Sequence, residues 1–494
     1  GDGRETPHRD VSTMNNVLQK YASQFSFILV DEYQDTNKIQ AAIIKNLSVV
    51  HNNVLVVGDD AQSIYSFRAA DVKNILNYEK EYPNAKIFKL ETNYRSTEEI
   101  LKVANNVISN NVEQYRKELR VAGVGANGRS PLPRPALHPQ MDQQSEANFV
   151  ADKIEELIKN GTPESEIAVL FRAAYHSQML EVELVKRGID YDYRGGVRFF
   201  ERAHIKDILS YLRLVNNIAD AAAWLRVLMH EEGVGPVAAQ RVVDALKNIY
   251  QLADVAGIGQ NILTGKASAG WANFISIWEK LLSSKSNKPQ DLIEALLSSS
   301  YKDYLEAEYV DSRERLADIK QLLVFAERYE NLEEFLADAS LQESYRAIAS
   351  EGEREKGKGE SKGKIILSTI HQAKGLEWTA VFVINLSTGA FPNDRALRED
   401  GGLEEERRLF YVAITRAKKY LYLTYPMAGG SFGDFLSGSS LFLNEIESDL
   451  IDDHSLLSMN STVLDDDNAD VHYVSEDQPK KIRPGSFLID VDDF

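Results

Sequence analysis

Two adjacent acidic residues, Asp31 and Glu32, are the first candidates for chemistry in this sequence. They follow directly on the apolar run FSFILV at residues 25–30, a pattern typical of a buried strand. In an open parallel sheet, side chains at the carboxyl end of a strand face the place where ligands bind. An aspartate there can hold Mg²⁺ on nucleotide phosphates, and the next carboxylate can orient or deprotonate an attacking water. A bare Asp-Glu pair is more often a solvated acidic loop, so the neighbouring strand ends decide.

Two further strand ends carry side chains suited to phosphates and bases. The run VLVV leads to Gln62, whose amide can report on a γ-phosphate, and then to Tyr65, Phe67 and Arg68, which offer two ring faces and a cation for base stacking. A third apolar run leads to Arg95 at a helix start, where anions bind. Taken singly, an aromatic pair two residues apart is more often core, and a lone arginine is usually a surface charge. Three such strand ends in succession favour phosphate chemistry.

Strands and helices must alternate to bring these ends together. Apolar positions spaced three and four apart predict a helix within 39–50, and Ser96 with Glu99 forms a capping-box pattern that begins the next helix. This rhythm predicts βαβ units around a parallel sheet. The predicted strands are 25–30, 54–57 and 87–90.

The rest of the chain changes character twice. After a Pro- and Gly-rich boundary at 121–139 the αβ rhythm resumes, and from about 213 to 350 amphipathic helical patterns replace it, with Trp224, Trp271 and Trp278 on apolar faces. Beyond the charged, Gly-rich stretch 351–363 the αβ pattern returns. The sequence therefore predicts a helical domain inserted into an αβ domain. Further strands are predicted at 167–171, 364–369, 380–385 and 420–425.

Composition excludes several classes of protein. The 494 residues are enough for about three domains. The absence of cysteine excludes disulfides, thiolate nucleophiles and Cys-ligated zinc. No apolar run reaches the roughly 20 residues of a membrane span, so we expect a cytoplasmic protein with no membrane partner. Because 56 basic against 75 acidic residues give a net charge of −19, positive charge for a nucleic acid must be local.

Five strings in the sequence carry a specific resemblance. They are DEYQDTN at 31–37, GDDAQSIYSFR at 58–68, NYRS at 93–96, STIHQAKGLEW at 368–378 and EERRLFYVAITRA at 405–417. In type and order they resemble motifs II to VI of the UvrD/PcrA/Rep family of superfamily 1 DNA helicases, with the helical insertion between IV and V. The resemblance covers the chain to about residue 430. It implies RecA-like parallel-sheet core domains of the P-loop NTPase type with an all-helical insertion domain.

The resemblance also implies a division of the chain. Residues 1–85 would be the remainder of the first core domain and 86–212 the first part of the second core domain. Residues 213–350 would be the helical insertion, 351–363 a flexible linker and 364–430 the last part of the second core domain. We expect 431–494 to be an acidic, disordered extension.

Roles in binding and hydrolysing ATP follow from the same resemblance. It implies that Asp31 positions Mg²⁺, Glu32 activates water and Gln62 senses the γ-phosphate. Arg95 and Arg416 would act as arginine fingers. It further implies a nucleotide-binding set made of Tyr94 on adenine, Glu377 on the sugar, and Lys374 and Gly375.

For DNA, the resemblance assigns Tyr65, Phe67, Arg68 and His371 to a single strand, along which family members move 3′-5′. Gly233 and Gly235, before a helical pattern, resemble the family's Gly-Ile-Gly turn, which presents backbone N–H groups to a duplex phosphate. A plain turn between helices is an equal alternative. A second Gly-Ile-Gly string at 257–259 lies in a poorer context.

One departure from the family leaves two hypotheses open. No G-x-x-x-x-G-K-[ST] string occurs, and only 30 residues precede Asp31. We expect the chain, which begins with Gly, to lack an N-terminal part, and to bind ATP weakly with little hydrolysis by itself. The first hypothesis is an ATP-dependent 3′-5′ helicase acting on single strands and single-strand/duplex junctions. The alternative is a non-catalytic DNA-binding or regulatory relative.

The basic cluster at 480–484 lies in the acidic C-terminal stretch. The family analogy makes it a candidate motif for a repair or transcription protein, and a solvated charge cluster is the alternative. The sequence does not choose between these readings.

Overall fold

The computed structural model describes residues 11–122, 133–194, 197–246, 255–284, 286–340, 363–428 and 438–455. The expected linker at 351–363, apart from Gly363, and the basic cluster at 480–484 lie outside these ranges.

The first αβ layer is small. Strands β1 (Ile28–Val30) and β2 (Val54–Val56) pair in parallel, joined by helix α2 (Lys38–Ser48). Helix α2 begins at Asn37, whose side chain accepts from the Gln40 amide at 2.8 Å while the Gln40 side chain accepts from the Asn37 amide at 2.9 Å. Helices α1 (Val11–Ala22), α3 (Lys73–Leu76) and α4 (Tyr78–Glu81) complete this part.

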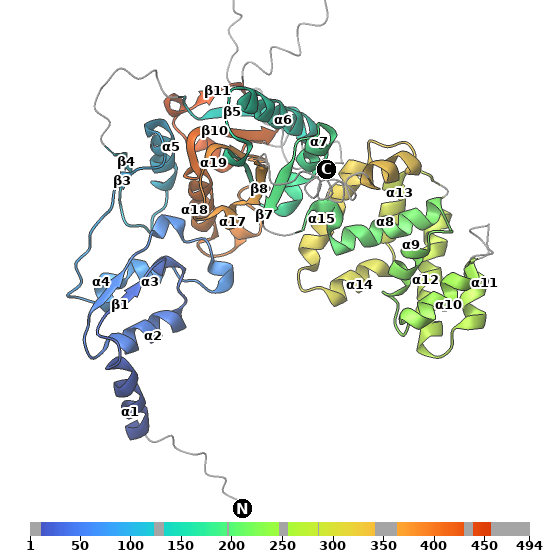
Figure 1. Cartoon of the computed structure of the whole chain (residues 1–494), viewed down its shortest axis with the longest axis horizontal. Coiled ribbons are helices and arrows are strands. Elements are labelled where there is room, and N and C mark those ends of the chain that lie inside the picture. Colours follow the sequence, from blue (N-terminus) through green and yellow to red (C-terminus); the bar gives the residue numbers. More distant parts are fainter. Residues whose placement is uncertain are drawn as a thin grey trace, which may run out of the picture. The chain divides into compact units, whose positions relative to one another are not determined.

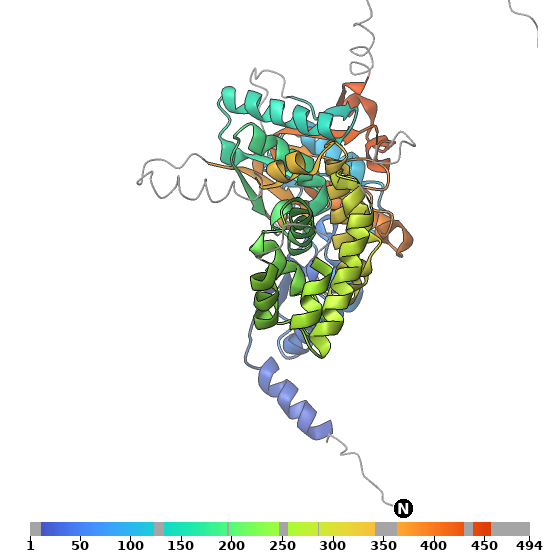
Figure 2. The ribbon, with the colours of Figure 1, turned by 90° about the vertical axis from the view of Figure 1, so that its right-hand side faces the viewer.

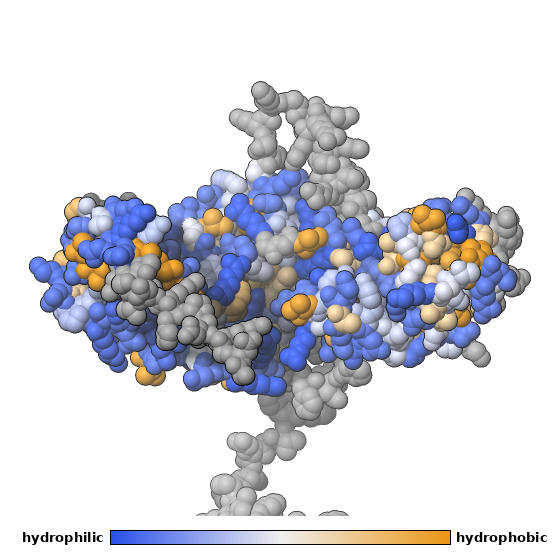
Figure 3. Space-filling view, turned by 90° about the horizontal axis from the view of Figure 1, so that it is seen from below, coloured by the Kyte–Doolittle hydropathy of each residue, from blue (hydrophilic) through white to orange (hydrophobic). Residues whose placement is uncertain are grey.

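The strand predicted at 87–90 is wrong. These residues have no strand partner, and the side chains of Phe88 and Leu90 are 81% and 84% exposed. An apolar run becomes a strand only where a neighbouring strand accepts its backbone hydrogen bonds, and the described part of this sheet has two strands. Hydrophobic side chains also lie exposed around β1 and β2, among them Leu29 and Leu55, and apolar surface is visible at the left of Figure 3.

The second αβ layer is a seven-stranded sheet in which every pairing is parallel, in the order β11-β5-β10-β9-β6-β8-β7. This confirms the predicted α/β class. The interior strand β6, next to the central strand β9, is buried at every residue, as expected for a sheet covered on both faces. The strands are β5 (Ala136–Gln140), β6 (Ile167–Phe171), β7 (Tyr191–Arg194), β8 (Ile365–Thr369), β9 (Trp378–Val383), β10 (Ala417–Pro426) and β11 (Asp452–Asp453).

Helices cover the two faces of this sheet (Figure 1). Alternate residues of a strand pack against opposite helix layers. Val169 of β6 packs in one core cluster with α6 (Gln143–Lys159) and α7 (Gln178–Lys186). Leu170, its neighbour, packs in the other cluster with α5 (Glu98–Ile108) and α18 (Gly402–Ile414). The period of two along β6 thus divides the apolar residues between both helix layers.

The sheet extends beyond residue 430, where we expected the second core domain to end. After helix α19 (Leu441–Asn444), strand β11 pairs with β5, and Phe442 and Ile451 are buried. The acidic composition concealed this segment, because its apolar residues are few and its two strand residues are exposed aspartates.

The helical region begins ten residues earlier than predicted, with α8 (Ala203–Asn216), and its described residues form helices and no strand (Figure 2). Trp224, Trp271 and Trp278 are each 1% exposed, so the predicted apolar faces meet in its core. The helices after α8 include α9 (Ala221–Leu228), α10 (Pro236–Leu246), α11 (Ala256–Ile262), α12 (Lys266–Ser283), α13 (Pro289–Leu297), α14 (Ser300–Glu308) and α15 (Ser312–Ala326), and residues 332–340 are also helical.

Candidate functional site

The adjacent acids Asp31 and Glu32 follow β1 directly, and both are exposed. Glu32 adopts a left-handed backbone conformation with φ of 51°, and its amide donates to Asp31 Oδ1 at 2.9 Å. The side-chain amide of Gln34 donates to the Glu32 carboxylate, and Gln34 Oε1 accepts from the Asp59 amide at 3.0 Å. Gln34 is completely buried. The Glu32 carboxylate is therefore oriented by a side chain anchored to the next strand end.

Gln62 lies in the turn that follows β2. Its Nε2 donates to Asp59 Oδ2 at 2.7 Å, and Asp59 Oδ1 accepts from the Ala61 amide at 3.0 Å. Asp59 also contacts the ammonium group of Lys117. The Gln62 carboxamide is therefore hydrogen-bonded to Asp59, whose carboxylate is in turn contacted by the Ala61 amide and by Lys117.

Lys374 connects both strand ends to the segment that follows β8. Its ammonium donates to Asp35 Oδ2 at 2.5 Å and to the Gln62 carbonyl at 2.8 Å, and lies 3.6 Å from a Glu32 carboxylate oxygen. Burial raises the pKa of Asp35, and the contact with Lys374 opposes that rise. The predicted nucleotide contact of Lys374 is an ammonium bound by protein oxygens in this structure. The adjacent Gly375 has φ of +84°, which only glycine adopts without strain.

Arg95, Glu377 and Arg416 come together at a second cluster. Arg95 Nε pairs with the Glu377 carboxylate, and this hydrogen bond and charge lower the pKa of Glu377. Arg416 is 1% exposed and donates to the carbonyls of Val412 and Leu376, each at 3.0 Å. Burial, together with the charge of Arg95, lowers the pKa of Arg416 to about 10, so it remains a cation at neutral pH.

The ring of Tyr94, next to Arg95 in the chain, is 87% exposed. It is available to stack on a planar ligand. The residues predicted from the sequence thus give a cationic cluster with an exposed ring beside it.

The predicted aromatic residues also meet. Phe67 packs edge-on against His371 with ring centroids 5.4 Å apart and against Tyr65 at 5.9 Å, and the Arg68 guanidinium lies 5.5 Å from the Phe67 ring. Tyr65 donates from its hydroxyl to the His371 carbonyl at 3.1 Å. Phe67 is 65% exposed, so one ring face is open to solvent.

His371 within this group is a neutral side chain. Burial, followed by the charges of Arg172 and Arg68, lowers its pKa to about 3. The group is therefore two aromatic rings, a neutral imidazole and one guanidinium. That combination suits stacking and a phosphate contact.

Gly233 and Gly235 lie before α10 in the helical region. Gly233 has φ of +77°, and a Cβ there would lie 2.6 Å from the Cβ of Lys266. A Cβ on Gly235 would meet nothing within 4 Å. Of the two, only Gly235 is free of a structural requirement. The second Gly-Ile-Gly string lies inside α11, where Gly259 packs against Trp271.

The sequence matches two family models in succession. Residues 7–83 match the UvrD/REP helicase N-terminal domain, and residues 88–427 match the UvrD-like helicase C-terminal domain. The chain belongs to the UvrD-like helicases. This confirms the resemblance inferred from the five motifs.

Individual relatives of this UvrD-like chain are about equally similar to it. The ATP-dependent DNA helicase PcrA of Staphylococcus aureus (strain MRSA252) is 38% identical over 461 residues, covering 89% of this chain and 60% of the relative. PcrA of Bacillus subtilis (strain 168) is 37% identical over 454 residues, covering 88% and 60%. The chain thus spans 60% of the length of these relatives.

A solved structure of the C-terminal domain of a possible DNA helicase from Lactobacillus plantarum WCFS1 matches 74% of this chain and 99% of that one, with 11% identity and a TM-score of 0.29. A likeness at that TM-score supports no argument. Within the described ranges, no helix of the UvrD-like chain has the length and apolar character of a membrane span, and no group of three or more His, Asp or Glu side chains could hold a metal ion.

Sequence reasoning missed the residues that hold the site together. Gln34 orients Glu32, and Lys117 pairs with the acid that holds Gln62. Gln34 stands inside a quoted motif, so its position offered a signal. Lys117 lies between motifs, and nothing in its local sequence indicated a buried partner.

Proposed function

We propose that this chain is the larger part of an ATP-dependent DNA helicase that moves 3′-5′ along single-stranded DNA and unwinds duplexes. The observation that carries the proposal is the bridge made by Lys374. Its ammonium contacts Asp35 and the Gln62 carbonyl, while Glu377, three residues further on, pairs with Arg95. Acids, amide and arginines from all five motifs therefore share one region.

The nucleotide partner in this proposal is ATP, bound together with Mg²⁺. Hydrolysis of the terminal phosphate of ATP supplies the energy for movement. Asp31 presents an exposed carboxylate for the metal, and Glu32 accepts a proton from water. Gln62 orients the water or the terminal phosphate. Little covalent chemistry is required of the protein, because neutralising charge and positioning account for most of the catalysis.

The cationic cluster supplies that neutralisation. An arginine carries five N–H groups, and the described contacts of Arg416 use three, with Val412, Leu376 and Thr415. Two remain for phosphate oxygens. Arg95 supplies a second guanidinium. The remaining nucleotide contacts proposed are Tyr94 on adenine, Glu377 on the sugar, and Lys374 and Gly375 beside the phosphates.

Glu32→Gln, made in the complete protein as its gene encodes it, tests the catalytic assignment. We expect ATP affinity to be retained and DNA-stimulated phosphate release to fall by about 100-fold or more. Glu79→Gln, an exposed acid of α4, is the matched control and should keep normal turnover. Near-normal turnover in Glu32→Gln would remove Glu32 from this role.

Phe67→Ala tests the DNA assignment. Loss of one base stack should weaken binding of an oligo-dT strand by about 1–3 kcal/mol. Phe88→Ala serves as control, because Phe88 is also exposed but lies outside the aromatic group. Equal affinities for the two variants would show that Phe67 does not stack on DNA.

The absence of a G-x-x-x-x-G-K-[ST] string favours a second candidate function, a DNA-binding relative without ATPase activity. For residues 1–494 alone we propose weak ATP binding and little hydrolysis, because no such loop cradles the phosphates. Measuring phosphate release with single-stranded DNA separates the cases. Robust phosphate release from residues 1–494 would refute the proposal that this part alone hydrolyses little ATP, and it would also refute the second candidate function. Phosphate release from the complete protein only would support the helicase.

A further inference from the structure

Lys117 is a largely buried cation at a point where the sequence showed no motif. Its ammonium contacts the carboxylates of both Asp59 and Asp60, the latter at 2.8 Å, and its side chain is 17% exposed. Burial alone lowers the pKa of Lys117, but the charges of the two aspartates outweigh burial and raise it. Lys117 is therefore a permanent cation between two acids of the turn that carries Gln62.

The acid paired with Lys117 determines the orientation of the Gln62 carboxamide. A carboxylate only accepts hydrogen bonds, so the group that faces Asp59 Oδ2 at 2.7 Å must be the Gln62 NH₂. The second N–H and the carbonyl oxygen of the amide then point elsewhere. Without Lys117, the Asp59 carboxylate would keep the Ala61 amide but lose its charge partner, so it would hold Gln62 less firmly.

The backbone links Lys117 to the arginine cluster as well. Lys117 lies three residues before β4 (Arg120–Val121), which pairs in parallel with β3 (Thr92–Asn93). Strand β3 leads directly into Tyr94 and Arg95. The β3-β4 pair therefore connects the arginine-bearing segment to Lys117, which contacts Asp59, the partner of Gln62.

We propose that Lys117 is a positioning residue: acting through Asp59, it fixes the carboxamide of Gln62 and so sets how strongly the site distinguishes a nucleoside triphosphate from a diphosphate. This role rests on the proposed function, in which Gln62 senses the terminal phosphate. The simpler alternative is that Lys117 only neutralises the buried Asp60 and the half-buried Asp59, in which case its loss lowers stability without changing nucleotide preference.

The test compares the affinities of the complete protein for ADP and for a non-hydrolysable ATP analogue. We expect Gln62→Ala and Lys117→Met each to reduce the preference for the triphosphate by about 10-fold, and the double variant to lose no more than either alone. Lys117→Arg should keep the preference. Lys102→Met, an exposed lysine of α5 paired with surface glutamates, is the matched control.

Lys117→Met leaves the buried carboxylate of Asp60 and the half-buried carboxylate of Asp59 without their shared ammonium group and so is expected to lower the melting temperature. Lys117→Met combined with Asp60→Asn removes one of those charges, and the same 10-fold loss in this balanced variant supports the proposal. A preference that is unchanged there, or losses that multiply in the double variant with Gln62→Ala, overturns it. If Gln62→Ala loses the preference for the triphosphate and the Lys117 variants keep it, the inference about Lys117 fails and the proposed function is unaffected. If the unaltered protein shows no preference, the proposed function fails with it.

Discussion

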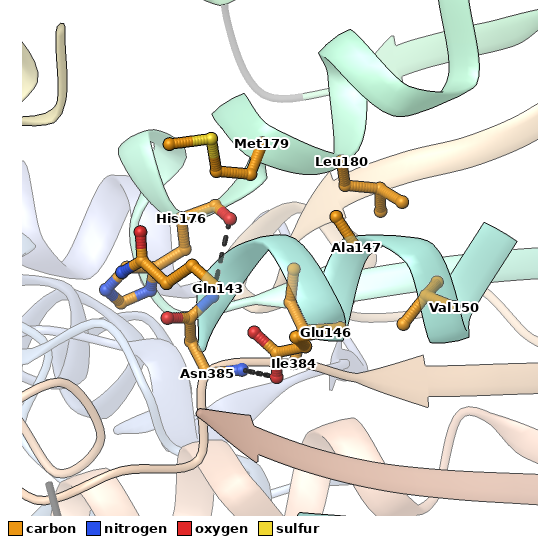
Figure 4. Close-up of a pocket in the computed structure, with 9 residues that line it drawn as sticks. All are labelled: Gln143, Glu146, Ala147, Val150, His176, Met179, Leu180, Ile384 and Asn385. Carbon is orange, nitrogen blue, oxygen red and sulfur yellow. Dashed lines mark hydrogen bonds between the residues drawn. The ribbon is translucent and has the colours of Figure 1, made fainter. Parts of the chain in front are cut away.

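The buried carboxyl of Glu146 is expected to make the stability of the second αβ layer depend on pH. Glu146 lies on α6, 3% exposed, where its Oε1 accepts from the Asn385 amide at 2.9 Å and from the Thr424 hydroxyl at 2.6 Å. Figure 4 shows it beside a small pocket, with Asn385 also donating to the His176 carbonyl. Burial raises the pKa of Glu146 to about 7, in spite of both hydrogen bonds.

The sign and size of the pH effect on stability follow from the pKa of Glu146. An acid with a higher pKa when folded stabilises the fold below its unfolded pKa of 4.5, and the contribution is lost as pH rises through 7. At 1.36 kcal/mol for each pKa unit between 4.5 and about 7, the loss is about 3 kcal/mol. Glu146→Gln keeps an acceptor for Asn385 and Thr424 without the charge. We therefore expect the variant to be about 2–3 kcal/mol more stable than the unaltered chain at pH 8, with the gain vanishing near pH 4.5.

Two histidines, the buried His176 and the half-buried His138, change the stability in the opposite direction. Burial lowers the pKa of His176 to about 3 and that of His138 to about 4, so their contributions are present above 6.5 and are lost on acidification. Glu146 is not among the causes of either histidine shift, so we expect both histidines to contribute about equally in the variant and the unaltered chain. The difference between the two curves therefore isolates Glu146.

Hydrogen exchange of peptides spanning β9 and β10, corrected for the intrinsic pH dependence of exchange, measures the local free energy of opening from pH 4.5 to 8. Glu156→Gln, on an exposed position of the same helix, is the control and should leave the curve unchanged. If the free energy of opening depends on pH in the same way in Glu146→Gln and in the unaltered chain, Glu146 is not the titrating group. A variant less stable at pH 8 would show that the carboxylate is stabilising and refute the reasoning.

Two further changes test how the fold holds its functional segments. Arg172→Gln should lower the free energy of unfolding by about 3 kcal/mol, because it leaves the Glu406 carboxylate without a cation. In the structure that carboxylate is 5% exposed and lies 2.6 Å from the Arg172 guanidinium. A loss below about 1 kcal/mol in thermal unfolding would contradict this expectation. Gly233→Ala should cost about 1–2 kcal/mol from its positive φ and its approach to Lys266, whereas Gly235→Ala should change stability by less than about 0.5 kcal/mol. Should Gly235→Ala weaken binding of a duplex oligonucleotide by fluorescence anisotropy at normal stability, the duplex contact is supported; equal binding by Gly235→Ala and the unaltered chain would leave Gly235 as a plain turn.

Several elements of the two αβ layers could be predicted because their signals are local. Strand β6 was read from five consecutive apolar residues, and the motif residues fell where the chain leaves a strand, as Asp31 does after β1. Spacing along one segment fixes such features, since the residues that decide them are neighbours in sequence. The meeting of Phe67 with His371 came from the family resemblance and not from spacing.

What escaped prediction depends on distant partners. Ser96 was read as a helix cap, yet its hydroxyl donates at 2.7 Å to the carbonyl of Ala417, and Thr97 is instead the N-cap residue of α5, which begins at Glu98. The run at 87–90 has strand composition but no strand beside it. The pairing of Lys117 with Asp59 joins residues 58 positions apart. Such contacts are decided by the fold, so no local pattern can report them.

The net charge, which argued against a nucleic-acid partner, has a structural explanation. Residues 451–494 hold 11 acidic and three basic side chains, which accounts for −8 of the −19. Of the acids that remain, several at the candidate site are engaged by cations, as Asp35 is by Lys374 and Glu377 by Arg95. Net charge is a sum over the whole chain, whereas a ligand meets the potential of a few side chains within about 10 Å. A chain with this sum can therefore present Arg68 and the arginine cluster to phosphates while remaining acidic as a whole.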